Sequence, residues 1–124
     1  LVTTPGDSAV YRDLLTIDLD LESIIQPQQT ELWQNYPNPF NPETWIPFQI
    51  SEESVVNIHI YTAAGEWVRT VDLGLKTVGI YANPSRAAYW NGKNTMGETV
   101  TSGIYYYAID TGTFHQAKRM VILK

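Results

Sequence analysis

The chain has 124 residues, of which 44% are hydrophobic and 17% are charged, and its formal net charge is −5. The basic residues are scattered apart from the pair Lys118 and Arg119, so no basic face is available to neutralise phosphates, which excludes nucleic-acid binding and attachment to a membrane surface. No apolar run approaches the roughly 20 residues of a membrane span, and the absence of cysteine excludes disulfides, thiolate metal sites and a cysteine nucleophile.

Residues 1–30 differ in character from the rest of the chain. Apolar residues recur at helical spacing over Val10–Ile24, whereas Leu15–Glu22 alternate apolar and acidic residues as an edge strand would. We favour the helix because its pattern covers more residues, and we interpret residues 26–30 as a polar linker. Because the chain begins at Leu1 rather than at a methionine, we expect this segment to be the end of an upstream region of a longer protein.

The next segment, Tyr36–Phe48, has the sequence YPNPFNPETWIPF and contains four prolines. Proline fixes φ, removes a backbone donor and pushes the preceding residue toward extended geometry. The segment is therefore predicted to be a stiff, extended lead-in to a β-domain. We expect Tyr36 and Phe40 to dock into the end of that domain, because prolines reduce the entropy lost on ordering.

Residues 31–124 are predicted to form an all-β domain, an antiparallel β-sandwich of about seven short strands. The clearest strand is 55–62, in which Val56, Ile58 and Ile60 alternate with polar residues and are expected to face the core. Turn signals follow at residues 63–66, 91–92 and 111–112, where Gly and Asn tolerate positive φ. The other predicted strands are 44–50, 67–73, 86–90, 104–110 and 114–123, with a longer connection over 74–85.

Few residues offer catalytic or metal-binding chemistry. His59 and His115 are the two histidines, and a lone strand histidine is more typical of a half-buried or surface position than of a catalytic one. No serine has the Gly-x-Ser-x-Gly context of a nucleophile elbow. The acidic ladder Asp18–Glu22 lacks the glycine and glutamate that an EF-hand loop would place after it, which favours a solvated face. We expect no enzyme activity, no metal and no cofactor.

Two further groups of residues have competing interpretations. Asn91, Asn94 and Glu98 are more typical of turn chemistry than of a metal site. The chain is rich in aromatic residues, with eight tyrosines and four tryptophans. Exposed aromatics would form a sugar-stacking platform, whereas buried ones would anchor the core of a small domain, and we favour the core. The aromatic residues concerned are Trp33, Trp45, Trp67, Trp90, Tyr105, Tyr106 and Tyr107.

Several ordered motifs from Leu32 onward carry a resemblance to one family. The chain resembles the FlgD-like Ig domain, which is related to the C-terminal sorting domains of type IX-type secretion. The resemblance implies an immunoglobulin-like sandwich over residues 31–124. Asn91 stands where the family commonly has Asp, and a turn tolerates either. The motif residues are Tyr36, Pro37, Asn38, Pro39, Phe40, Asn41, Pro42, Trp90, Asn91, Gly92, Gly97, Ser102 and Gly103.

The resemblance implies a non-catalytic domain at the C-terminal end of a larger exported protein, on the cell surface or outside the cell. Its expected partners are upstream domains of the same chain and the proteins of a secretion or surface-anchoring apparatus. The alternatives are a carbohydrate-binding accessory module with a polysaccharide partner, a structural spacer, and a scaffold domain like that of the flagellar hook cap. We expect recognition by strand pairing through the final residues, namely Lys118, Arg119, Met120, Val121, Ile122, Leu123 and Lys124.

Overall fold

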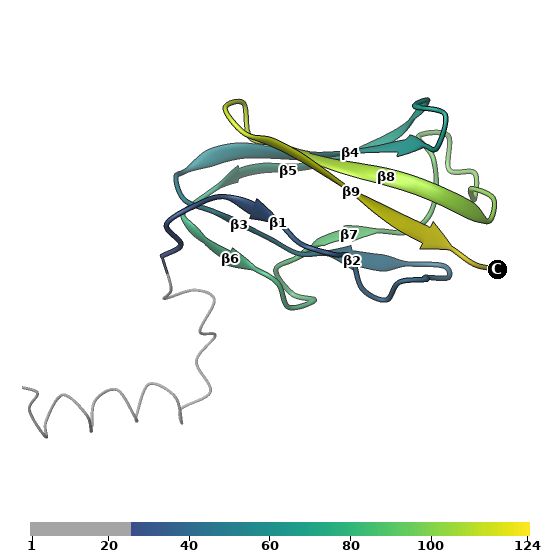
Figure 1. Cartoon of the computed structure of the whole chain (residues 1–124), viewed down its shortest axis with the longest axis horizontal. Coiled ribbons are helices and arrows are strands. Elements are labelled where there is room, and N and C mark those ends of the chain that lie inside the picture. Colours follow the sequence, from purple (N-terminus) through teal and green to yellow (C-terminus); the bar gives the residue numbers. More distant parts are fainter. Residues whose placement is uncertain (1–25) are drawn as a thin grey trace, which may run out of the picture.

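The computed structural model of the chain describes residues 26–124, so the predicted helix or edge strand before residue 26 lies outside the described residues. Nine strands follow one another along the described part of the chain (Figure 1). They are β1 (Glu31–Leu32), β2 (Thr44–Ile46), β3 (Phe48–Ile50), β4 (Ser54–Thr62), β5 (Trp67–Lys76), β6 (Gly79–Tyr81), β7 (Ala88–Trp90), β8 (Gly103–Asp110) and β9 (His115–Ile122).

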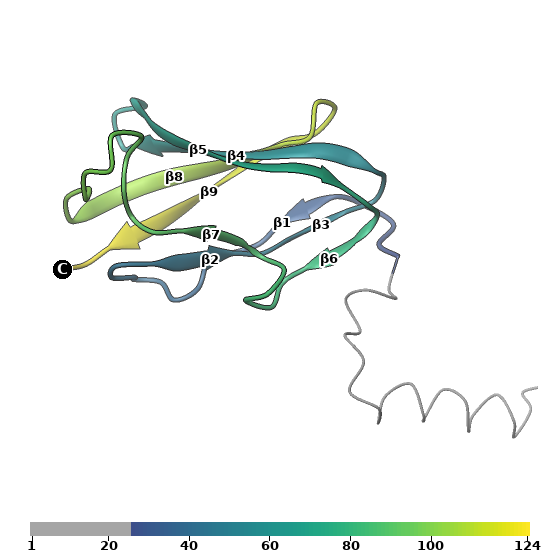
Figure 2. The same ribbon diagram turned by 180° about the vertical axis from the view of Figure 1, so that it is seen from behind.

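The strands lie in two facing layers, which confirms the predicted Ig-like β-sandwich. One layer is a four-stranded sheet in the order β5-β4-β8-β9. The opposite layer combines a three-stranded sheet, β1-β3-β6, with a two-stranded sheet, β2-β7. All of these strand pairs are antiparallel. Figures 1 and 2 show both layers from opposite sides, with the C-terminus at one end of the sandwich.

The core between the layers is built by alternation along each strand. Val56, Ile58 and Ile60 of β4 are completely buried, as predicted, because side chains of a strand point to its two faces in turn. The residues between them on the opposite face remain partly accessible. Other strands contribute in the same way, and the remaining fully buried large side chains are Leu32, Phe40, Ile46, Phe48, Ile50, Trp90, Tyr107, Ile109 and Met120.

The structure differs from the predicted strands in three places. The single strand predicted at 44–50 is two strands separated at Pro47: β2 pairs with β7, whereas β3 pairs with β1 and β6. Proline has no N–H for a ladder, so the chain can change partners there. The connection predicted at 74–85 contains the end of β5 and all of β6. The strand β1 was not foreseen, because two residues carry no periodic signal.

The predicted strand ends before Gly74 because glycine has a low strand propensity, whereas β5 continues to Lys76. Gly74 has a φ of 72° and sits beside a register shift between Val56 and Asn57 on the partner strand. A bulge accommodates one extra residue and lets the strand continue after it. The hairpin turn predicted at residues 63–66 is confirmed, with the Thr62 N–H donating to the Glu66 carbonyl at 2.8 Å.

Candidate recognition surface

The predicted recognition segment, Lys118–Lys124, combines core and surface residues. It belongs mostly to β9, which is an edge strand of the four-stranded sheet. Met120 and Ile122 are buried in the core. Arg119 and Lys124 are exposed, as is Leu123, whose exposed fraction is 64%. Lys118 and Val121 are half-buried.

The open edge of this part of β9 is already occupied by the proline-containing segment. The Phe40 N–H donates to the Val121 carbonyl at 3.0 Å, and the Leu123 N–H donates to the Phe40 carbonyl at 3.2 Å. Asn38 Oδ1 accepts from the Val121 N–H at 2.9 Å, and Gln34 Nε2 donates to the Arg119 carbonyl at 2.8 Å. A partner strand would have to displace these contacts, so the side chains, rather than the strand edge, remain available for recognition.

The proline-containing segment is held against the sandwich by buried groups. Phe40 is 2% exposed, and its ring centroid lies 5.7 Å from that of Trp90. Asn35 is also buried; its N–H donates to Tyr107 Oη at 2.8 Å, and its Nδ2 donates to Thr44 Oγ1 at 2.9 Å. Phe40 docks as predicted, whereas Tyr36 is half-buried and stacks on Trp45.

Tyr107 extends this anchor from the opposite sheet. Its hydroxyl accepts from the Asn35 N–H and donates to the Trp33 carbonyl at 2.7 Å, so it satisfies two backbone groups of the incoming chain. Burial raises the pKa of Tyr107 to about 12, against the smaller opposing effect of the Asn35 N–H. The hydroxyl therefore stays protonated and able to donate under ordinary conditions.

Gly92 in the predicted turn after β7 meets the same segment. It is buried, with a φ of 77°, and a Cβ built on it would lie 2.4 Å from the Pro42 carbonyl oxygen. Only glycine fits this position, because it tolerates a left-handed backbone and leaves room for a neighbouring chain. The glycine of the Asn91-Gly92 pair thus serves tertiary packing as well as the turn.

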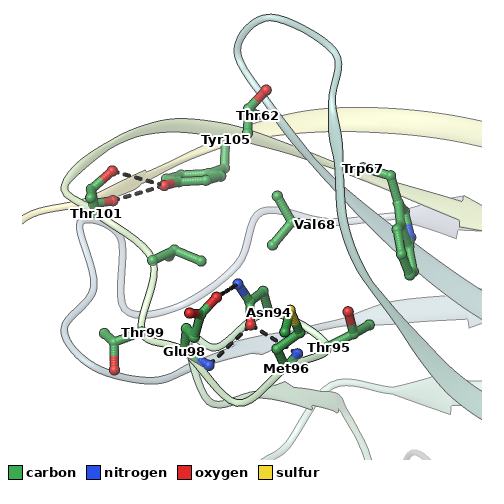
Figure 3. A pocket seen from close by; sticks show the side chains of 11 residues that line it. Thr62, Trp67, Val68, Asn94, Thr95, Met96, Glu98, Thr99, Thr101 and Tyr105 are labelled. Atoms are coloured by element: carbon green, nitrogen blue, oxygen red, sulfur yellow. Dashed lines mark hydrogen bonds between the residues drawn. The ribbon is translucent and has the colours of Figure 1, made fainter.

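A cleft of about 520 Å³ opens at the end of the sandwich that carries the C-terminus. Figure 3 shows Val68 and Tyr105 on its inner side and Met96, Asn94 and Glu98 along the loop below. The loop is ordered by Asn94, whose Oδ1 accepts from the N–H groups of Met96 at 2.9 Å and Glu98 at 3.0 Å. These contacts confirm the turn interpretation of Asn94 and Glu98.

The C-terminal residues lie close to the rim of this cleft. The Lys124 N–H donates to Ser102 Oγ at 3.0 Å, and Thr101, the residue before Ser102, lines the cleft. Met96 in the cleft wall is 81% exposed, and Leu123 is also largely exposed. Leu123 and the cationic Lys124 are thus exposed at the end of the sandwich that also carries the cleft.

Two histidines and an aspartate meet on the outer face of the four-stranded sheet, which the sequence did not predict. His59 Nε2 lies 3.5 Å from Asp110 Oδ2, and His115 Nδ1 lies 3.7 Å from Asp110 Oδ1. The Gly112 N–H, which donates to Asp110, holds the pKa of the carboxyl below its ordinary value, and the histidines contribute further to the lowering. Within residues 26–124, no group of three or more acidic, histidine or cysteine residues is arranged to hold a metal.

The aromatic residues divide between the core and the surface. Trp90, Tyr105 and Tyr107 are buried, which confirms the core interpretation for them. Trp67 and Tyr106 are exposed by 54% and 40%, so the core interpretation is wrong for these two residues. Trp33 and Trp45 are half-buried.

Residues 44–113 match the family described as the FlgD Ig-like domain. This match covers more than half of the 124 residues, so the chain belongs to the FlgD Ig-like domain family. The matched region contains Trp90, Asn91, Gly92, Gly97, Ser102 and Gly103, but it includes neither the Tyr36–Pro42 motif nor Lys118–Lys124. A search of curated proteins finds no significant match to this chain.

Two solved structures from Porphyromonas gingivalis share the fold. Dimeric latent PorU superposes with a TM-score of 0.58 at 17% identity, covering 80% of this chain and 10% of PorU. PorZ, described as an essential bacterial surface component of the type-IX secretion system, superposes with a TM-score of 0.50 at 17% identity, covering 75% of this chain and 11% of PorZ. The chain thus spans about a tenth of each of these proteins. Among the described residues, no helix has the length and apolar character needed to cross a membrane.

Proposed function

We propose that residues 31–124 are a non-catalytic Ig-like domain of a larger exported protein, and that this domain acts in secretion sorting or attachment to the cell surface. Residues 1–30 would then be the end of an upstream region. Membership of the FlgD Ig-like family and the fold shared with PorU and PorZ support this proposal. Its expected partners are proteins of the secretion or surface-anchoring apparatus, together with upstream domains of the same protein.

The observation that carries the proposal is that the C-terminal residues have a fixed backbone and exposed side chains. Phe40 and Asn38 hold the backbone of β9 by hydrogen bonds, while Arg119, Leu123 and Lys124 keep their side chains exposed. A partner that contacts this segment loses little backbone entropy, because the segment is already ordered. The exposed apolar and cationic side chains supply the chemistry of a protein–protein contact.

The experiment fuses the 124-residue chain to a reporter protein in a bacterium that has a type IX secretion system. Surface display is compared between wild type, the double variant Arg119→Ala with Lys124→Ala, and the control Lys93→Ala, which removes an exposed cation outside the terminal segment. Melting temperatures are measured on the purified variants. We expect a large loss of display for the double variant alone, with all three proteins equally stable.

The alternatives make different predictions in the same assay. A structural spacer or a scaffold domain like that of the flagellar hook cap needs only a stable fold, so the double variant would display as well as wild type. That result would remove the recognition role of the terminal segment. A wild-type fusion that never reaches the surface would refute sorting by this domain. An equal loss of display in Lys93→Ala would show that display depends on net charge and not on the position of the cation.

A further inference from the structure

Three aromatic side chains form a continuous row on the outer face of the β2-β7 sheet, and we call this row the aromatic strip: Tyr36, Trp45 and Tyr89. Trp45 pairs with Tyr89 across β2 and β7, and Tyr36 pairs with Trp45 through an isolated bridge. The ring centroids of Tyr36 and Trp45 are 6.2 Å apart at an interplanar angle of 21°, and those of Trp45 and Tyr89 are 5.6 Å apart at 52°.

The strip lies outside the core because of the strand period. Thr44 and Ile46, the neighbours of Trp45, are buried, and so are Ala88 and Trp90, the neighbours of Tyr89. Alternation therefore points the ring of Trp45 away from the core, and it does the same for Tyr89, whose exposed fraction is 45%. Packing between the layers does not require large rings at these positions. Tyr89 is exposed and Tyr36 and Trp45 are half-buried, so the strip presents one open ring beside two partly accessible ones, and a surface apolar patch of this kind is a candidate binding surface.

A carboxylate lies at one end of the strip. Tyr89 Oη donates to Glu43 Oε1 at 2.6 Å, and this hydrogen bond is the largest cause of the raised pKa of Tyr89. The second carboxylate oxygen, Glu43 Oε2, makes no hydrogen bond within the described residues and remains an available acceptor. The strip thus combines a row of π-faces with an acceptor for hydroxyl groups.

We propose that the aromatic strip binds a neutral polysaccharide, with the rings stacking on sugar faces and Glu43 accepting hydrogen bonds from sugar hydroxyls. The electron-rich face of an aromatic ring attracts the weakly positive C–H groups on the face of a sugar ring. A row of three rings offers consecutive stacking positions, which suit a polymer better than a single sugar. Single-stranded nucleic acid also stacks on aromatic rings, but its phosphates would be repelled by a chain of net charge −5.

A proline-rich peptide is the strongest competing ligand, because it also docks on aromatic side chains. Such peptides bind in aromatic-lined grooves. None of the three strip residues lines the cleft beside Met96 or the smaller one beside Phe114. The strip crosses the face of a sheet, which favours a ligand with flat faces of its own.

The test is native affinity electrophoresis of the 124-residue chain in gels containing one of four neutral polysaccharides: hydroxyethyl cellulose, laminarin, mannan or dextran. We expect concentration-dependent retardation by at least one of them. Tyr89→Ala, which removes the most exposed ring of the strip, should weaken binding by about tenfold or more, as truncation of a residue that carries much of the binding energy does. Trp45→Ala should abolish it. Trp67→Ala, which removes an exposed ring from the opposite sheet, is the matched control and should leave retardation unchanged.

Circular dichroism of each variant separates loss of binding from loss of folding, and Tyr89→Ala keeps the test decisive if Trp45→Ala does not fold. Absence of retardation by all four polysaccharides would overturn the proposal. So would retardation that Tyr89→Ala leaves unchanged, or that Trp67→Ala removes. Saturable quenching of tryptophan fluorescence by a deca-proline peptide, with no polysaccharide binding, would assign the strip to peptide docking instead.

Discussion

Replacement of Gly92 by alanine should destabilise the domain far more than the same replacement at Gly65. Both glycines have positive φ, 77° at Gly92 and 89° at Gly65, so an alanine at either position incurs left-handed strain of about 1–2 kcal/mol. Only at Gly92 would the new Cβ also meet another chain segment, 2.4 Å from the Pro42 carbonyl oxygen. At Gly65 there is nothing within 4 Å.

The clash at Gly92 involves backbone rather than the end of a flexible side chain. Relieving it requires the Pro42 segment to shift, and overpacking of this kind costs about 1–3 kcal/mol. Gly92→Ala should therefore lower the free energy of unfolding by about 2–5 kcal/mol in total, against about 1–2 kcal/mol for Gly65→Ala. Replacing glycine by alanine also lowers the conformational entropy of the unfolded chain, which favours the folded state. This stabilisation is the same for both substitutions and cancels in the comparison.

Urea denaturation followed by tryptophan fluorescence measures both variants, and linear extrapolation gives the two free energies. At roughly 4 °C per kcal/mol for a domain near this size, Gly92→Ala should also lower the melting temperature by about 8–20 °C. Equal destabilisation of the two variants would refute the reasoning. It would mean that Pro42 moves away from the turn at no cost and that the segment is not tightly docked there.

Two further predictions concern side chains that join distant parts of the chain. Tyr107→Phe should lower the free energy of unfolding by about 1–3 kcal/mol, because it leaves the Asn35 N–H and the Trp33 carbonyl without their buried partner; unchanged stability in urea denaturation would contradict this anchor. Asp110→Asn should be less stable than wild type at pH 7, and the difference should disappear in acid. The folded state lowers the Asp110 pKa, so its charged form stabilises the fold above the ordinary pKa of 3.8, and this contribution is lost as the pH falls through the lowered value. Melting temperatures of the variant and of wild type are compared between pH 2 and pH 7. A difference that stays constant over this range would contradict the prediction.

Local patterns in the sequence were sufficient to predict the long strands and several turns of this domain. The alternation of Val56, Ile58 and Ile60 placed their side chains in the core, because the period of two depends only on strand geometry. The Asn91-Gly92 pair predicted a turn because both residues tolerate positive φ. The prolines before residue 43 excluded a helix, because their restriction of φ is a property of the residue itself. The predicted extended course was wrong, since the chain bends at residues 37–39 and 41–42.

Tertiary structure alone decided which segments meet. Nothing local to Pro47 indicates that β2 and β3 take different partners, because pairing depends on residues some forty and thirty positions further along the chain. The same limit hid the coverage of the β9 edge by Phe40 and the approach of Pro42 to Gly92. The aromatic strip escaped prediction for a related reason: the strand period gives the face on which a ring lies, but only the strand register brings Trp45 and Tyr89 side by side.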